Sequence, residues 1–258
     1  MDGSAPIVEM VGMNKRFGGL HAVRDLSIDL HAGEVVGVLG HNGAGKSVLM
    51  KMLSGALERD SGEIRVRREP AHINNPRDAR GYGIETIYQD LALADNLNAP
   101  ANLFLGRELM TRLGTMNDDA MEAETRTVLK RLNPDFTNIN DPMITMSGGQ
   151  RQVVAIARAI HFDAKILIMD EPMAALGPAE AAMVAELTRQ LRTEGIGIFL
   201  ISHDLHDVFD LCDRIMVMKN GRNVGVHRID EVTKDDLLSL IIVGHLPEGW
   251  TPRNRTVG

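Results

Sequence analysis

The chain has 258 residues, of which 44% are hydrophobic and 24% are charged, and its net charge is −7 from 28 basic and 35 acidic side chains. This length and composition predict one large soluble α/β domain, or such a domain with an insertion, that buries a sizeable core. The acidic balance argues against a general nucleic-acid binder, so no nucleic-acid partner is expected.

The N-terminal segment 1–9 carries acidic residues and no apolar core segment, so we do not expect a secretory signal. The longest apolar stretches, 196–201 and 237–243, are much shorter than the ~20 residues that a membrane-spanning helix needs. Any membrane association is therefore expected to come through a partner. The single cysteine, Cys212, excludes an intrachain disulfide, fits a reducing cytoplasm and is expected to be a small buried apolar residue.

Strands and helices are predicted to alternate along most of the chain. Near the N-terminus, alternating polarity predicts half-exposed antiparallel strands, at 7–11 and 26–30. Continuous apolar runs predict strands buried on both faces of a parallel sheet, at 35–39, 166–169 and 196–201, and 84–88 is a shorter strand candidate. Helical spacing of apolar residues predicts helices in the intervening segments, at 48–53, 150–160 and 184–191. The Asn220-Gly221 pair predicts a hairpin between 215–218 and 222–226.

The segment from about 90 to 160 interrupts this alternation, because it has no strong strand pattern. Met121, Val128, Leu129 and Leu132 mark one face of a helix that ends at Asn133-Pro134. We therefore expect an α-helical subdomain inserted here. The chain is predicted to be a single domain over 1–245 followed by a loosely held tail over 246–258.

The segment Gly40–Ser47 matches the phosphate-binding pattern G-x-x-x-x-G-K-[ST] between a predicted strand and a predicted helix. Glycines let backbone N–H groups turn toward an anion, and the N-terminus of the following helix adds a positive dipole. Lys46 is predicted to reach the β- and γ-phosphates, and Ser47 to ligate Mg²⁺. The predicted nucleotide-binding residues of this loop are Gly40, His41, Asn42, Gly43, Ala44, Gly45, Lys46, Ser47 and Val48.

Four polar residues follow predicted strands, where ligands bind in open α/β sheets. Asp170 suits a magnesium ligand, and Glu171 suits a general base or an orienter of the attacking water. Gln89 could touch Mg²⁺ or that water, and His203 could bond the γ-phosphate. Taken singly, each of these residues also has a structural interpretation. The two acids could be solvated, the glutamine could lie on the surface, and the histidine could be structural. Their order behind a phosphate-binding loop favours the catalytic interpretation.

A second anion site is predicted where Ser147-Gly148-Gly149-Gln150 opens a helix. With this motif the sequence resembles the ABC transporter ATPases over about residues 5–235. The resemblance implies an α/β P-loop NTPase core with a mostly parallel sheet, an N-terminal antiparallel β subdomain and the helical insertion. It also implies that the signature motif of one subunit binds the ATP held by the opposite subunit.

The resemblance assigns further roles and an activity, the hydrolysis of MgATP. Ser147 and Gly149 would contact the γ-phosphate in trans, and Gly148 and Gln150 belong to the same nucleotide-binding motif. Phe17 matches the aromatic position that stacks on adenine. Gln89 matches the loop that joins the γ-phosphate site to the helical subdomain and the permease. His203 matches the switch histidine.

Within the family, the segments 43–55, 83–89 and 102–108 resemble bacterial monosaccharide importers of the ribose, xylose and fructose type, in the single-domain form. This implies a sugar-transporting translocase subunit that forms a homodimer or a pair with another ATPase subunit. It also implies partners, transmembrane permease subunits and a periplasmic or lipid-anchored sugar-binding protein, and a peripheral place on the cytoplasmic face of the inner membrane. The alternatives are an importer of another cargo such as nucleosides, a soluble ABC ATPase, or a non-hydrolysing regulatory subunit.

The sequence departs from the family pattern at Gly177, which stands where the D-loop usually has an aspartate that helps one subunit sense the other. Milder departures are Met146, Met173 and Val48. None of them removes a contact to phosphate, Mg²⁺ or water.

Overall fold

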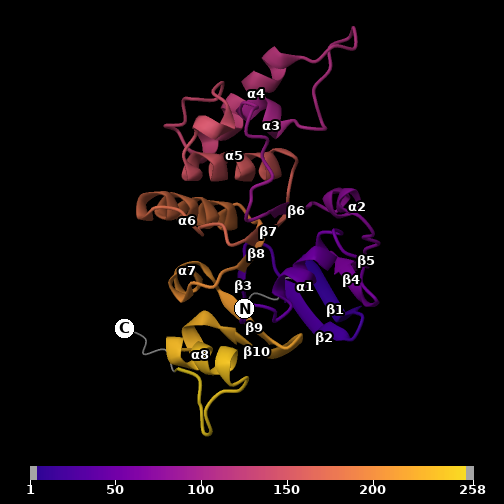
Figure 1. Ribbon diagram of the computed structural model, residues 1–258, viewed down its shortest axis with the longest axis vertical. Coiled ribbons are helices and arrows are strands. Elements are labelled where there is room, and N and C mark those ends of the chain that lie inside the picture. Colours follow the sequence, from indigo (N-terminus) through magenta and orange to yellow (C-terminus); the bar gives the residue numbers. More distant parts are fainter. Residues whose placement is uncertain (1–4, 254–258) are drawn as a thin grey trace. The chain divides into compact units, whose positions relative to one another are not determined.

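The computed structural model describes residues 5–253. Residues 1–4 of the predicted domain and 254–258 of the predicted tail lie outside the described residues. The chain forms two compact units, each with its own elements, which are labelled in Figure 1. Of the described residues, the first unit comprises 5–86, 165–171 and 189–253, and the second comprises 87–164 and 172–188.

A six-stranded sheet in the order β10-β9-β3-β8-β7-β6 forms the centre of the first unit. β3 pairs in parallel with β8 and β9, and β7 pairs in parallel with β8, whereas β9 and β10 form the predicted antiparallel hairpin. Every residue of β3 and β8 is buried, so the mostly parallel sheet expected from the apolar runs is confirmed. The strands are β3 (Val35–Leu39), β6 (Ile84–Ile87), β7 (Ile166–Asp170), β8 (Gly197–Ile201), β9 (Arg214–Lys219) and β10 (Arg222–Arg228).

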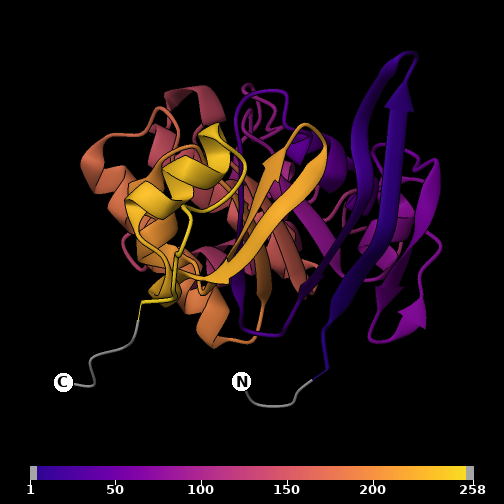
Figure 2. The same cartoon turned by 90° about the horizontal axis from the view of Figure 1, so that it is seen from below.

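An antiparallel sheet in the order β2-β1-β4-β5 accounts for the N-terminal part of the chain. Its strands are β1 (Val8–Phe17), β2 (Leu20–Leu30), β4 (Ser61–Val66) and β5 (Glu69–Pro70). The long β1–β2 pair is drawn in indigo in Figure 2. Both strands are longer than the sequence predicted, because register shifts such as the one between Met10 and Met13 interrupt the polar–apolar alternation without ending the pairing.

One hydrophobic core unites buried residues of both sheets and of α1 in the first unit. The helices of the first unit are α1 (Lys46–Leu53), α2 (Pro76–Gly81), α7 (Leu205–Leu211), the 3₁₀ turn η2 (Ile229–Glu231) and α8 (Lys234–Ile242). A capping box between Thr233 and Asp236 begins α8. Beyond α8, the Trp250 ring lies 5.4 Å from that of His227, centroid to centroid, so this part of the predicted tail packs against β10.

The only cysteine, Cys212, follows α7 and is buried. A Cβ added at Gly37 of β3 would lie 2.9 Å from its Sγ, so the sulfur packs against the backbone of a central strand. Burial raises the pKa of this thiol well above its ordinary value. The expected role of Cys212 as a small buried apolar residue is confirmed.

The second unit is built from helices, which are α3 (Ala99–Leu103), α4 (Asp118–Leu132), the 3₁₀ turn η1 (Met143–Thr145), α5 (Gly148–His161) and most of α6 (Pro178–Thr193). The predicted face of α4 is buried, and Asn133 ends that helix as expected. Together with the two sheets, these helices confirm the predicted α/β fold class with a helical insertion. Among residues 5–253, none of the helices combines the length and apolar character needed to span a membrane.

Arg214, at the start of β9, joins three parts of the first unit through a half-buried ion network. Its guanidinium donates to the carboxylates of Asp29 (3.1 Å) and Glu34 (2.9 Å) and to the Asp29 carbonyl (2.8 Å), and its side chain is 13% exposed. Burial acts to raise the pKa of Asp29, but the hydrogen bonds and charge of Arg214 outweigh it and lower that pKa.

We expect Arg214→Ala to lower the free energy of unfolding by about 2–4 kcal/mol, because it leaves two partly buried carboxylates without their cation. Urea denaturation at pH 7 measures this loss, with the exposed Arg222→Ala on the same hairpin as control. Since the pKa of Asp29 is lowered on folding, its share of the stability is present above its ordinary pKa and is lost as the pH falls through the lowered value. A difference between wild type and variant that grows in acid would contradict this account.

Candidate functional site

The Gly40–Ser47 loop leads from β3 into α1, and close backbone contacts require two of its glycines. Gly40 and Gly45 have φ angles of 148° and 105°, and added Cβ atoms would lie 2.3 Å from the Met218 carbonyl oxygen and 2.4 Å from that of Ala22. Gly45 begins α1 without a side-chain cap. The first-turn N–H groups of α1 therefore remain suited to an anion.

Lys46 is held above this loop by the carbonyls of its own turn. Its Nζ donates to the Gly40 carbonyl at 2.7 Å and to the His41 carbonyl at 3.3 Å. Burial lowers the pKa of Lys46, while the nearby charges of Glu171 and Asp170 act in the opposite direction. The charges of both acids thus act on the ammonium, and an arriving phosphate would offer it a stronger acceptor than a neutral carbonyl.

Asp170 and Glu171 lie at the carboxyl end of β7. Burial and the adjacent Glu171 raise the pKa of Asp170, against the opposing charges of Lys46 and Lys51. The backbone of Glu171 is left-handed, with φ 51°, and its N–H donates to the Ile201 carbonyl of β8 at 2.9 Å. This turn holds the backbone from which the Glu171 side chain projects.

His203 follows β8 and meets Glu171. Its Nδ1 lies 3.0 Å from Glu171 Oε1, and the two side chains are 68% and 22% exposed. The first unit therefore brings together one cation, two acids and an imidazole beside a phosphate-binding loop.

Phe17, at the end of β1, is 46% exposed, with the Lys15 ammonium 5.7 Å from its ring centroid. A ring this exposed can accept a flat base.

The second unit contains the predicted signature residues, at the start of α5. Ser147 and Gln150 form a capping box, in which the Ser147 N–H donates to Gln150 Oε1 at 3.0 Å and the Gln150 N–H to Ser147 Oγ at 3.3 Å. Gly148 is exposed, and Gly149 is buried with its N–H bonded to Glu180. The donors of this turn face an acceptor within the unit.

Gln89 is exposed and belongs to the second unit, so the structure does not place it with Lys46. The turn after it contains two consecutive left-handed residues, Leu91 (φ 58°) and Ala92 (φ 47°). Arg158 of α5 holds that turn by donating to both carbonyls, at 3.0 and 2.8 Å. The loop that carries Gln89 is thereby tied to the helix that carries the signature.

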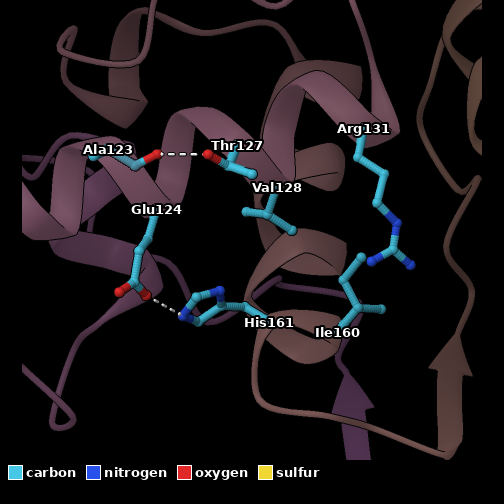
Figure 3. Close-up of a pocket in the computed structure, with 7 residues that line it drawn as sticks. All are labelled: Ala123, Glu124, Thr127, Val128, Arg131, Ile160 and His161. Atoms are coloured by element: carbon cyan, nitrogen blue, oxygen red, sulfur yellow. Dashed lines mark hydrogen bonds and ion pairs between the residues drawn. The ribbon is translucent and has the colours of Figure 1, made fainter.

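A separate pocket of about 430 Å³ opens between α4 and α5 (Figure 3). An ion pair between Glu124 and His161, 3.2 Å apart, lies on one side, and Val128 and Ile160 form an apolar part of its lining. None of the predicted site residues lines this pocket.

Two residues near these sites escaped the prediction from sequence. Lys51, the next lysine along α1, contributes to the charge around Asp170. Glu180 contacts the signature turn, and the available signal was a glutamate three residues after Gly177, at the start of α6, where a capping acid is common.

The comparisons with known proteins agree with one another. A family model described as ABC transporter matches residues 23–174, more than half of the chain. The chain is 42% identical to the fructose import ATP-binding protein FrcA of Rhizobium meliloti, with 92% of this chain and 94% of that protein covered. It is 38% identical to the ribose import ATP-binding protein RbsA of Caldanaerobacter subterraneus subsp. tengcongensis over 94% of this chain, and it spans about half (49%) of that relative's length.

Among solved structures, cbiO1 from Clostridium perfringens, part of the ABC transporter complex cbiONQ, superposes with a TM-score of 0.77 at 26% identity. The superposition covers 93% of this chain and 97% of cbiO1. The chain thus shares the fold of cbiO1.

Proposed function

The chain belongs to the ABC transporter family, and from this premise we propose that it is the ATP-hydrolysing subunit of an importer that powers uptake of a sugar through a membrane permease. One observation carries the proposal. One unit brings Glu171 and His203 together and also carries the Gly40–Ser47 loop, and the other unit has a capped helix N-terminus at Ser147 whose donors suit an anion. The similarity to the fructose import protein over nearly the full length of both chains supports the importer class and the cargo.

Two subunits are proposed to enclose two ATP molecules. Each triphosphate lies on the Gly40–Ser47 loop of one subunit, with Lys46 at the β- and γ-phosphates and Phe17 stacked on the adenine. The Ser147–Gly149 turn of the other subunit completes the site at the γ-phosphate. Such a division makes closure of the pair depend on bound ATP.

Hydrolysis is proposed to use positioning and charge more than covalent chemistry. Glu171 orients the attacking water and accepts its proton, and the left-handed turn at the end of β7 carries its side chain. His203 bonds the γ-phosphate, and its contact with Glu171 supports a role beside that residue. Gln89 senses the γ-phosphate and transmits its presence along the loop held by Arg158.

The residues of this site fit Mg²⁺. Burial and the neighbouring Glu171 disfavour the ionised form of Asp170 and raise its pKa, and a bound divalent cation would favour the carboxylate again. Among residues 5–253 there is no group of three or more His, Cys, Asp or Glu side chains that could hold a metal alone. Mg²⁺ usually takes one or two protein ligands together with substrate phosphates, and we propose Ser47, Asp170 and Gln89 for that role. When bound, the ion neutralises charge on the phosphate oxygens.

The partners and the location follow from the same proposal. The ATPase pair would dock on permease subunits at the cytoplasmic face of the membrane, and an external sugar-binding protein would deliver the cargo. The sugar is chosen by those partners. Co-purification with a permease would support transport, and a chain that hydrolyses ATP but associates with no membrane protein would favour a soluble ATPase.

The shared site is tested by two arrangements of the same two substitutions in a mixed dimer. With Lys46→Ala on one chain and Ser147→Arg on the other, one site keeps both intact halves, and roughly half of the ATPase activity is expected to remain. With both substitutions on one chain and none on its partner, each site loses one half, and activity is expected to vanish.

Phosphate release from differentially tagged, co-purified dimers measures both arrangements. Thr145→Arg, an exposed position two residues before Ser147, controls for the added arginine. The reverse order of activities would show that each chain completes its own site.

A further inference from the structure

The carboxylate of Glu180 bridges the first turns of two helices in the second unit. Its Oε1 accepts the N–H of Gly149 in α5 at 3.2 Å, and its Oε2 accepts the N–H of Gly177, just before α6, at 3.3 Å. The Ser147 hydroxyl also bonds this carboxylate, and these three donors lower the pKa of Glu180. Glu180 is therefore an ionised acceptor for two donors of the signature turn.

Helix capping explains only half of this arrangement. A glutamate three residues into a helix commonly reaches back to the N–H before it, as Glu180 does to Gly177. Gly149 belongs to another helix, 31 positions earlier in the chain. Its N–H is one of the first-turn donors that α5 cannot satisfy internally, and Glu180 supplies the negative charge that such a turn prefers.

Glycines at positions 149 and 177 leave room for the contact between Glu180 and the Gly149 N–H. A Cβ added at Gly149 would lie 3.0 Å from the Cβ of Glu180, so glycine permits the close approach of the two helices. A Cβ added at Gly177 would lie 3.9 Å from Glu180 Oε2. An aspartate at position 177 would thus place a second carboxylate beside the first, and glycine leaves Glu180 without that repulsion.

We propose that Glu180 is a resident anion that occupies the Ser147–Gly149 turn until the γ-phosphate of ATP on the partner subunit displaces it. This inference rests on the proposed function, because it concerns the same two donors. Carboxylate and phosphate oxygens repel each other at one set of donors, so closure requires the Glu180 side chain to turn away. The carboxylate therefore raises the ATP concentration that closes the pair and opposes closure on a nucleotide that lacks the γ-phosphate.

Glu180→Gln tests the proposed displacement of Glu180 in a Glu171→Gln background. In that background the closed dimer is expected to accumulate, because the bound ATP is not hydrolysed. The amide keeps the size of the side chain and removes its charge. We expect the midpoint ATP concentration for dimer formation to fall roughly three- to tenfold, a modest shift because the contact is partly exposed to solvent. Light scattering during an ATP titration measures the midpoint. Asp119→Asn, an exposed acid of α4 in the same unit, controls for the change in net charge.

The direction of the shift separates this role from a structural one. If Glu180 only supported the signature turn, its loss would raise the midpoint, and an unchanged or raised midpoint overturns the inference. A parent Glu171→Gln chain that does not dimerise with ATP refutes the proposed function and this inference together. Thermal unfolding checks that the variant folds. Glu180→Ala, which removes the carboxylate and favours helix, must shift the midpoint in the same direction.

Discussion

Glu171→Gln is expected to lower steady-state ATP turnover by a factor on the order of 10²–10⁴ and to trap a dimer with ATP bound. The amide has nearly the shape of the carboxylate, so the left-handed turn and the bond to the Ile201 carbonyl persist. What disappears is the acceptor for the proton of the attacking water. Binding and closure remain, while the step that would reopen the pair is lost.

Phosphate release measures turnover, and size-exclusion chromatography with light scattering measures the dimer in ATP and in ADP. Glu69→Gln, at an exposed acid of β5, is the matched control and should behave as the wild type. Normal turnover in the Glu171→Gln chain would remove Glu171 from the chemistry. Lost turnover without an ATP-dependent dimer would leave the base in place and contradict the shared site.

Lys46→Ala is expected to weaken ATP binding by a factor on the order of a hundred. The free energy of unfolding should fall by less than the free energy of ATP binding does. The side chain is half-buried, and its Nζ donates to the loop carbonyls of Gly40 and His41. Without the ammonium, the β- and γ-phosphates lose the lysine of the loop, and Asp170 and Glu171 repel them more strongly. Affinity for AMP, which has neither phosphate, should change little.

Titration with a fluorescent ATP analogue, competed by ATP, ADP and AMP, measures this pattern. Lys234→Ala, an exposed lysine at the start of α8, controls for the lost charge. Equal losses for all three nucleotides would indicate a damaged loop in place of a missing phosphate contact.

Much of the fold could be predicted because the apolar runs are unambiguous. Fully buried strands such as β3 and β8 have no polar face, and only a sheet covered on both sides accommodates them. Their order also makes the pairing of Glu171 with His203 foreseeable, since β7 and β8 are parallel neighbours and their carboxyl ends meet at one edge. The full length of β1 and β2 was not predictable, because bulges break the alternation that periodicity detects.

The contact of Glu180 with Gly149 was hidden for a different reason. It joins residues that are distant in sequence and depends on how α6 packs against α5, which no local pattern encodes. The role of Arg158 in holding the turn after Gln89 is of the same kind, as two carbonyls far away in sequence accept its guanidinium. Local chemistry thus predicts which groups would bind phosphate, and tertiary packing determines contacts such as that of Glu180 with Gly149.

The position of Cys212 has a practical consequence. Its sulfur is packed against β3 and its thiol resists ionisation, so it is a poor target for maleimide reagents while the protein is folded. Since it is also the only cysteine, a new one introduced at an exposed position can be labelled alone, with the native residue left in place. Spectroscopic distance measurements between two such labelled subunits could then follow opening and closing in the native background.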